Sequence, residues 1–329
     1  MGRKLKGKSN AKGLKAALQN QLFQQKLANS QKIKQQNLAN GKVQLSKKAI
    51  NQKARQQAKE STFVPFGKDE TLLLVGEGDF SFAKSIIMQD YIRPENLIVS
   101  SYDASVNELK LKYPHTFEDN YKYLTDLGVK IFFQINATNL IKTFKLSRHT
   151  PWKKIMGKEW QSKYLQNIMF NFPHTGKGIK DQDRNIADHQ ELIFGYFDSA
   201  KQLFKMVNTH IKHAKSSYTH GYKLDDEEKD VNAPGAITED GYGKIILSAF
   251  TGEPYDSWQI RLLAKKNGFV VDRSCRFQWS NYPEYHHKRT NSEQDTTKPA
   301  FERDARTYIF RQFAKRRPRV KEDADSDSD

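Results

Sequence analysis

The stretch Thr71-Leu72-Leu73-Leu74-Val75-Gly76-Glu77-Gly78-Asp79-Phe80-Ser81 joins two kinds of local structure. Its first five residues form a short apolar run, which is typical of a buried parallel strand. Gly76 stops this run, and residues 81–89 have the apolar spacing of a helix. Glycines between a strand and a helix allow a tight turn and the close approach of a ligand to unpaired helix amides. The stretch therefore predicts an α/β fold with a ligand site at this turn.

Strand and helix patterns continue to alternate downstream of this turn. We expect further strands at residues 97–102, 129–135, 164–170, 244–250, 269–277 and 307–313. We expect further helices at residues 105–112, 186–213 and 258–267. Such alternation builds parallel βαβ units and a doubly wound sheet. Because the last two strands have no helix between them, the sequence predicts seven strands, mostly parallel, with an antiparallel edge.

Charge is concentrated at the ends of the 329-residue chain, whose formal net charge is +17. Residues 1–60 hold 15 Lys and Arg and one acid, with too few aliphatic residues for a core. We expect a basic, largely disordered arm over residues 1–62 and a basic-then-acidic disordered tail over 316–329. The ordered domain is expected over 63–315, with a flexible insertion at about 215–243. A chain this basic is drawn toward polyanions such as RNA.

Several classes of protein are excluded by composition. Cys275 is the one cysteine, so no disulfide can form within the chain, and no Cys/His cluster has the spacing of zinc ligands. We therefore expect no metal site. No apolar run approaches the roughly 20 residues of a membrane span. Residues 1–10 hold four bases and no apolar core of a secretory signal. An intracellular protein without a membrane partner is expected.

The charge of the glycine turn indicates its ligand. A dinucleotide site has the pattern G-x-G-x-x-G and holds a pyrophosphate at the start of a helix. Here position 81 is Ser, and Glu77 and Asp79 add negative charge to the loop. Carboxylates repel a pyrophosphate but suit the amino group and sulfonium of S-adenosylmethionine. The turn therefore favours this methyl donor over NAD.

Residues after the next two strands extend this site. Asp103 lies 25 residues after Gly78, just past the second strand, where an acid can bind both ribose hydroxyls. The structural alternative is an Asp that caps the following helix. Asn136 and Ala137 follow the third strand and are placed to meet the adenine, although an Asn here could equally serve a turn.

The segment Asn171-Phe172-Pro173-His174 directly follows the fourth predicted strand. Ligands of open α/β sheets bind at the carboxyl ends of the strands, where this segment is expected. Asn offers an amide to a base edge, Phe a stacking face and Pro a fixed backbone. His174 could act on a proton or contact a phosphate. A simple turn into a helix is the structural alternative.

A basic stretch that contains an aromatic residue precedes this segment. Its members are Lys142, Lys145, Arg148, Trp152, Lys153 and Lys154. We expect them to form part of an RNA surface near the active-site edge, with a solvated charged face as the alternative for any single lysine.

Residues 75–82 together with residues 171–176 resemble a Rossmann-like family of rRNA uridine-N3 methyltransferases, whose fungal members modify 25S large-subunit rRNA. The similarity covers roughly residues 70–313. It implies a class I methyltransferase that uses S-adenosylmethionine to make 3-methyluridine. By position it implies a donor loop of Gly76, Glu77, Gly78, Asp79 and Phe80, a ribose contact at Asp103, adenine-side contacts at Asn136 and Ala137, and target-base contacts at Asn171, Phe172, Pro173 and His174.

The resemblance also implies a substrate and a mechanism. The substrate would be large-subunit rRNA or a pre-ribosomal particle, the location the nucleus and nucleolus, and we expect a monomer. The N3 atom of uracil carries a proton and lies on the pairing edge, so the base must be unpaired and deprotonated. We expect Phe172 to stack on the uracil, Asn171 to hold its edge and His174 to ease the loss of the proton.

Two alternative functions stay open at this point. One is an enzyme of the same fold that methylates an exocyclic base nitrogen. The other is a non-catalytic RNA-binding factor of ribosome assembly built on the same scaffold. A nicotinamide oxidoreductase is disfavoured by the acidic loop and the missing third glycine.

Overall fold

The computed structural model describes residues 63–147, 149–217, 237–238, 240–288, 290 and 299–313, together with Gln25. The chain divides into two compact units, residues 1–58 and 59–329, and the fold below belongs to the second. The predicted basic arm, the acidic tail and most of the insertion at 215–243 lie outside the described residues. Within the described part, no helix is both long and apolar enough to cross a membrane.

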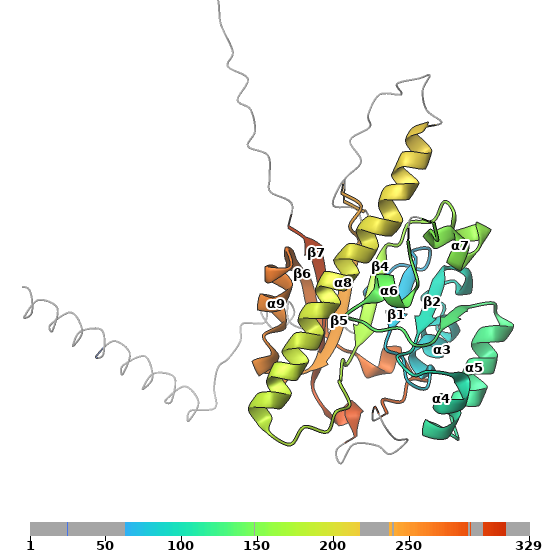
Figure 1. The fold of residues 1–329 in the computed structure, drawn as a ribbon. Coiled ribbons are helices and arrows are strands. Elements are labelled where there is room, and N and C mark those ends of the chain that lie inside the picture. The colour runs from blue at the N-terminus through green and yellow to red at the C-terminus, as the bar shows by residue number, and fades with distance from the viewer. Residues whose placement is uncertain are drawn as a thin grey trace, which may run out of the picture. The chain divides into compact units, whose positions relative to one another are not determined.

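A seven-stranded sheet forms the centre of the second unit, with the strand order β3-β2-β1-β4-β5-β7-β6 (Figure 1). The strands are β1 (Leu72–Val75), β2 (Leu97–Ser100), β3 (Lys130–Phe132), β4 (Asn167–Asn171), β5 (Lys244–Phe250), β6 (Phe269–Arg276) and β7 (Ala305–Gln312). The first five are parallel, and β7 is antiparallel to both β5 and β6. The predicted mostly parallel sheet with an antiparallel edge is therefore confirmed.

Helices cover both faces of this sheet. They are α3 (Ser81–Met88), α4 (Val106–Lys112), α5 (Phe117–Asp126), α6 (Leu140–Thr143), α7 (Trp152–Met156), α8 (Gln182–Ser217) and α9 (Ile260–Lys266), with short 3-10 turns η1 (Pro94–Asn96), η2 (Lys158–Trp160), η3 (Asp256–Trp258), η4 (Trp279–Asn281) and η5 (Ala300–Glu302). One core contains α6, α8 and α9, and the other contains α3, α4 and α5. Alternate β1 residues enter the two cores, since Leu73 packs in the first and Leu72 in the second.

Helix α5 is the longest of three helices that the sequence pattern does not predict, the others being the short α6 and α7. Its buried positions are Phe117, Asn120 and Leu124, one of which is polar. Phe117, Tyr121 and Leu124 do have the spacing of a helix stripe, but the stripe is short and the other residues are polar apart from Tyr123. The helix is held by its packing, because the Phe117 ring lies against Phe80 with 5.3 Å between ring centroids.

The strand order places a switch point between β1 and β4. From β1 the chain proceeds to β2 and β3 on one side, and it then returns to β4 and β5 on the other. Ligands of such sheets bind outside the carboxyl ends of the strands at the point of reversal. The loops that follow β1, β2, β3 and β4 therefore meet at one edge of the sheet.

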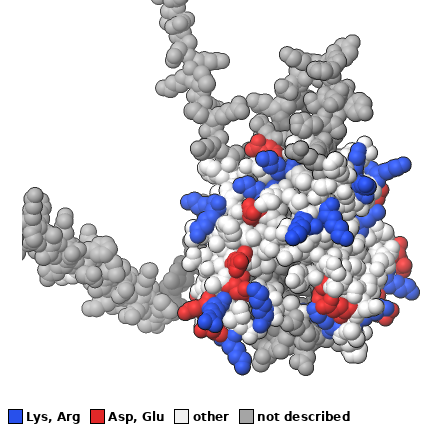
Figure 2. All heavy atoms as spheres, viewed as in Figure 1, with Lys and Arg blue, Asp and Glu red and all other residues white. Residues whose placement is uncertain are grey.

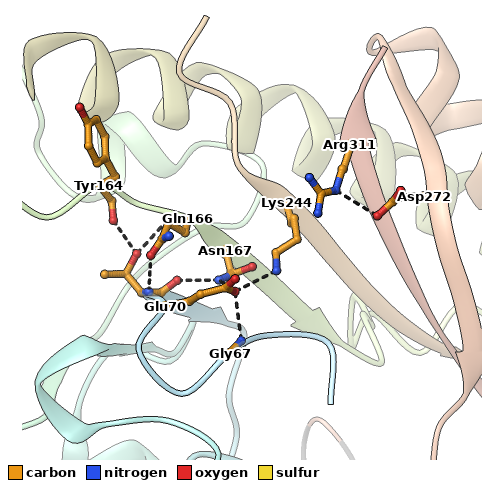
Figure 3. A network of polar contacts seen from close by, with 9 residues as sticks. Gly67, Glu70, Tyr164, Gln166, Asn167, Lys244, Asp272 and Arg311 are labelled. Atoms are coloured by element: carbon orange, nitrogen blue, oxygen red, sulfur yellow. Dashed lines mark hydrogen bonds and ion pairs between the residues drawn. The ribbon is translucent and has the colours of Figure 1, made fainter. Parts of the chain in front are cut away.

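A buried ion pair fastens the opposite, amino-terminal edge (Figure 3). The Glu70 carboxylate accepts hydrogen bonds from Lys244 Nζ at 2.8 Å, Asn167 Nδ2 at 2.9 Å and the Gly67 amide at 3.1 Å. These residues precede β1 or begin β4 and β5. Burial raises the pKa of Glu70, but the charge and hydrogen bonds of Lys244 and the other donors outweigh it and leave the pKa lowered. The carboxylate therefore stays ionised and tied to three segments.

Replacing Lys244→Met should destabilise the fold by roughly 3–5 kcal/mol, because it leaves the Glu70 carboxylate buried without a counter-charge. Urea denaturation of the full chain measures this loss. The matched control is Arg311→Met, which breaks the more exposed pair of Arg311 with Asp272, also drawn in Figure 3, and should cost at most about 1 kcal/mol. Equal losses in the free energy of unfolding would show that the buried Glu70–Lys244 pair stabilises the fold no more than the exposed pair does.

Candidate active site

A cleft of about 1320 Å³ opens at the carboxyl ends of the parallel strands. Eleven of the twelve predicted site residues line it: Gly76, Glu77, Gly78, Asp79, Asp103, Asn136, Ala137, Asn171, Phe172, Pro173 and His174. Phe80 does not line the cleft, because its ring is fully buried in the second core. Segments up to about 100 residues apart in the sequence thus contribute to one site.

The glycine loop is as compact as the sequence predicts. Gly76 has a φ of 72°, and a Cβ at this position would lie 2.5 Å from a ring carbon of Phe170. The backbone amide of Glu77 donates to the Ser100 carbonyl at 2.9 Å, which ties the loop to β2. A larger residue at Gly76 would therefore be strained and would collide with β4.

Asp79 shapes this loop from within. Its Oδ1 accepts hydrogen bonds from the Ser81 amide at 3.0 Å and the Ser81 hydroxyl at 2.6 Å. Its Oδ2 accepts one from the Thr116 hydroxyl at 2.9 Å. Both oxygens are therefore occupied by the protein, and Asp79 contributes to the cleft chiefly through its charge.

Glu77 is buried beside Asp79 at the start of α3. Burial, and secondly the negative charge of Asp79, raise the pKa of Glu77 to about 8, although a hydrogen bond from the Ala83 amide opposes the rise. At neutral pH the carboxyl is therefore mostly protonated in the absence of a ligand. A cation in the cleft would favour its ionised form.

Asp103 faces the cleft and is paired with a residue that the sequence analysis missed. The cap of α4 is Ser105, whose hydroxyl accepts from the Glu108 amide at 3.3 Å, so the alternative capping role of Asp103 is not realised. Asp103 Oδ1 forms an ion pair with Lys112, and Oδ2 accepts from the Ser101 hydroxyl at 3.1 Å. Lys112 also lies 3.3 Å from Glu108, and this four-residue spacing was the available sequence signal.

Asn136 takes the turn role that was its structural alternative. Its Oδ1 accepts hydrogen bonds from the Thr138 amide and hydroxyl, each at 2.9 Å. Asn136 and the buried Ala137 still line the cleft after β3. These two residues would therefore contribute to ligand binding partly by fixing the shape of this turn.

Asn171 ends β4 with an unpaired amide. Its Oδ1 and Nδ2 are both buried, and neither has a hydrogen-bond partner among the described residues. The next amide, of Phe172, donates to the Ser248 carbonyl at 2.8 Å and holds the strand end against β5. An unsatisfied buried amide costs roughly 1–3 kcal/mol, so its presence in a cleft indicates a place for a polar ligand.

Phe172 forms a wall of the cleft. Its ring is 9% exposed and lies 4.6 Å from the ring of Phe250 and 5.5 Å from that of Trp279, with which it is stacked. Trp279 in turn stacks on Tyr285 at 5.7 Å. With these neighbours, little of the Phe172 ring remains for stacking on a base.

His174 presents a hydrogen-bond donor to the cleft. Its Nδ1 accepts from the Gly176 amide at 2.9 Å, so the neutral ring carries its proton on Nε2. The His174 side chain is partly exposed at the cleft, and desolvation of its ring, and secondly the neighbouring His189, lower its pKa against the opposing charge of Asp188. The ring therefore stays neutral at physiological pH, and its Nε2 is placed to donate a proton in a hydrogen bond rather than to accept one.

His189 is a second residue that the sequence analysis missed. It is buried in α8 and stacks on Trp258, with 4.5 Å between ring centroids and an interplanar angle of 8°. Its Nδ1 donates to the Asn185 carbonyl at 2.7 Å, and its ring meets His174 edge-on at 4.8 Å. His189 falls within a helix that the apolar spacing already predicts. Nothing in the sequence therefore indicated that its ring contacts His174.

Within the predicted RNA surface of residues 142–154, the part in α7 is contradicted by the structure, whereas Lys142 and Lys145 flank Thr143, which lines the cleft. Trp152 is buried, with its ring 5.5 Å from Phe144, so it is not available to bases. Helix α7 packs against η2, whose Glu159 pairs at 3.0 Å with Lys130 at the start of β3, away from the cleft edge. Arg148 lies outside the described residues. Figure 2 shows Lys and Arg interspersed with acids on the face that carries α8, without a single basic patch there.

Both signs of charge line the cleft. Glu77, Asp79 and Asp103 lie on the side of β1 and β2, where Lys112 pairs with Asp103. On the side of β4 and β7, Lys177 pairs with Asp188, and Arg303 lies just before β7. The group of acids suits a cationic cofactor, and Arg303 suits an anionic substrate.

The strand order and the acidic glycine loop place this chain among the Rossmann-like class I methyltransferases. A family model described as "BMT5-like: rRNA (uridine-N3-)-methyltransferase BTM5-like" matches residues 73–289. The chain belongs to this family, and the resemblance seen in the sequence is confirmed.

Individual relatives agree with this assignment. The 25S rRNA (uridine(2634)-N(3))-methyltransferase of Saccharomyces cerevisiae is 54% identical over 339 residues, which cover 100% of both chains. The ferredoxin-fold anticodon-binding domain-containing protein 1 homolog of Mus musculus is 26% identical over 242 residues, 73% of this chain and 31% of that protein. A solved putative methyltransferase from Thermoplasma acidophilum has a TM-score of 0.34 and 12% identity over 77% of this chain and 76% of that chain, which is too distant to bear on the fold.

Glu77→Gln should stabilise the ligand-free protein, with a gain that grows as the pH rises. Because the pKa of Glu77 is about 8 in the folded state and near 4.5 in the unfolded state, the folded state binds more protons between these values and loses stability as pH increases. The gain should be small at pH 5 and on the order of 1 kcal/mol or more at pH 8 to 9. Urea denaturation across this range measures it.

The control for this prediction is Glu108→Gln. The pKa of Glu108 is lowered by the hydrogen bond from the Ala104 amide, and secondarily by Lys112, so its removal should give no gain at high pH. A gain for Glu77→Gln that does not change with pH would contradict the raised pKa.

Proposed function

We propose that this chain transfers the methyl group of S-adenosylmethionine to N3 of a uridine in large-subunit rRNA. The observation that carries the proposal is the unpaired amide of Asn171, buried in a cleft whose other side is acidic, in a member of the uridine-N3 methyltransferase family. We infer that the uridine corresponds to the position 2634 that the name of the yeast relative states.

The donor side of the cleft fits S-adenosylmethionine by charge. Glu77 would hold the positively charged methionine end, and its ionisation would accompany binding. Asp103 would bind the ribose hydroxyls while Lys112 keeps the carboxylate in place. Asn136 and Ala137 would border the adenine. When bound, S-adenosylmethionine supplies an electrophilic methyl group.

The target side would make N3 of the uracil reactive. Loss of the N3 proton leaves an anion whose charge is shared with the two ring carbonyl oxygens. Asn171 Nδ2 and His174 Nε2 would donate hydrogen bonds to these oxygens, which would lower the N3 pKa and let the proton pass to water. Phe172 would support this geometry as part of the wall.

This assignment changes the role expected for His174. As the hydrogen bond from Gly176 occupies Nδ1, the ring has no free acceptor for the N3 proton. A donor at this position suits a carbonyl oxygen beside a ring nitrogen, whereas the unpaired Asn171 Oδ1 could accept from an exocyclic amine. Membership of the uridine-N3 methyltransferase family favours uridine N3 of the two.

The remaining properties follow from the substrate. An rRNA-modifying enzyme acts where the ribosomal RNA is made or assembled, and we propose the nucleolus. Either free large-subunit rRNA or a pre-ribosomal particle would present the base unpaired. We propose that the chain acts as a monomer.

Deletion of the gene should remove 3-methyluridine from large-subunit rRNA. Mass-spectrometric nucleoside analysis measures this loss, and the deletion strain is then complemented with the wild-type chain or with Asp103→Ala. We expect the wild type to restore the nucleoside and Asp103→Ala to fail, since the ribose contact is lost. Unchanged 3-methyluridine in the deletion strain would refute the proposed function. Loss of another methylated base instead would show that the enzyme methylates a different atom.

Two substitutions of His174 separate its roles. His174→Gln retains a donor near the Nε2 position and should keep kcat within about tenfold of wild type, whereas His174→Asn retains only the acceptor for Gly176 and should lose about 10²-fold. Single-turnover methylation measures both. Because the pKa of His174 is lowered, the methylation rates of the wild type and of His174→Gln should depend on pH in the same way above about pH 6.5. If His174→Gln is as slow as His174→Asn and its rate depends on pH differently from that of the wild type, His174 accepts the N3 proton and the donor role is wrong.

A further inference from the structure

Arg303 is the one arginine among the described residues that line the cleft. It follows η5 and precedes β7, and its side chain is half-buried. Its Cζ lies 3.5 Å from the centroid of the Phe250 ring, which places the guanidinium against that ring. Its Nη2 donates to the Tyr255 hydroxyl at 2.5 Å. Two neighbours therefore fix the guanidinium at the cleft without neutralising its charge.

Nearby acids are engaged elsewhere. Asp304 forms an ion pair with Arg276 at 2.8 Å. Glu253 accepts a hydrogen bond from the Ser257 hydroxyl at 2.6 Å, and Asp256 accepts one from the Gly252 amide at 3.2 Å. Within the described part of the chain, Arg303 forms no ion pair. A half-buried cation that is oriented but not paired is suited to an anionic ligand.

The position of Arg303 relates it to the target base. The Phe250 ring that carries its guanidinium lies 4.6 Å from the ring of Phe172, which directly follows Asn171. The guanidinium is thus two packed rings away from the strand end that bears the unpaired amide. This separation suits a group attached to the nucleoside rather than the reacting edge of the base itself.

We propose that Arg303 and Tyr255 form a phosphate-binding site for the nucleotide being methylated. This inference rests on the proposed function and adds to it a second contact to the same substrate. The planar guanidinium can give two parallel N–H donors to phosphate oxygens, and the Tyr255 hydroxyl, which accepts from Arg303, has its own proton to donate. The site holds the RNA backbone and so fixes the depth to which the uracil enters the cleft.

The experiment uses the full chain and large-subunit rRNA purified from cells that lack this protein. Arg303→Gln should raise KM for this rRNA by about tenfold or more, since a charge-assisted phosphate contact is lost. The slope of log(kcat/KM) against log[salt] should become shallower by about one. The dissociation constant of S-adenosylmethionine, measured by calorimetry, should not change.

Three further variants make the result specific. Arg303→Lys keeps the charge without the planar fork and should restore the salt slope but only part of the KM. Tyr255→Phe keeps the ring and should raise KM by about threefold. Arg276→Gln removes a neighbouring arginine that is already paired with Asp304 and should match wild type. Thermal unfolding of each variant identifies any loss of fold.

The outcomes separate this inference from the proposed function. A wild-type chain that makes no 3-methyluridine, either on this rRNA or on pre-ribosomal particles from the same cells, would refute the proposed function. A wild-type chain that makes it, with KM and salt slope unchanged in a folded Arg303→Gln, would refute the phosphate site alone. If Arg303→Gln lowers kcat with KM and salt slope unchanged, the guanidinium acts on the uracil and the phosphate site is again refuted. If Arg303→Gln fails to fold, the folded Arg303→Lys and Tyr255→Phe variants decide by their KM values.

Discussion

The ion pair between Glu70 and Lys244 is the constraint on which the site depends. It joins the segment before β1 to the start of β5, and Asn167 adds the start of β4. In parallel strands, the register set at the amino ends determines which residues emerge at the carboxyl ends. Val75 pairs with Phe170, so the glycine loop and Asn171 leave the sheet side by side. A slip of one residue would turn Asn171 to the opposite face and remove it from the cleft.

Tight turns at the carboxyl edge convert this register into a site. Phe80, Gln134 and Phe172 have positive φ values of 64°, 59° and 48°, and they lie in the loops after β1, β3 and β4. Such conformations cost of order 1–3 kcal/mol for residues other than glycine and persist only where packing enforces them. Phe80 and Phe172 are buried among other aromatic rings, which supplies that packing. The aromatic residues near the cleft thus fix the backbone, while polar neighbours are left facing the ligand.

Local signals explain what could be predicted from the sequence. The apolar run before Gly76 and the segment at Asn171 each combine strand and turn chemistry within a few residues, so both were placed correctly at the cleft. Lys112 had one signal, its four-residue spacing from Glu108. No local pattern marks His189 or Arg303, because their partners are distant in the chain or hidden in a helix. The predicted stacking role of Phe172 is disfavoured for the same reason, because its covering residue Trp279 lies more than 100 residues away.

The direction of β7 explains why the target side differs from the donor side. Since β6 runs parallel to the first five strands, the segment after it begins at the carboxyl edge. Since β7 runs the opposite way, the residues just before it, including Arg303, return to that same edge. The whole connection between these strands therefore starts and ends at the cleft, and it contributes His286, His287 and Lys288 to its lining. The parallel half of the sheet can thus keep the geometry needed for a common cofactor, while this connection can vary to recognise one particular RNA.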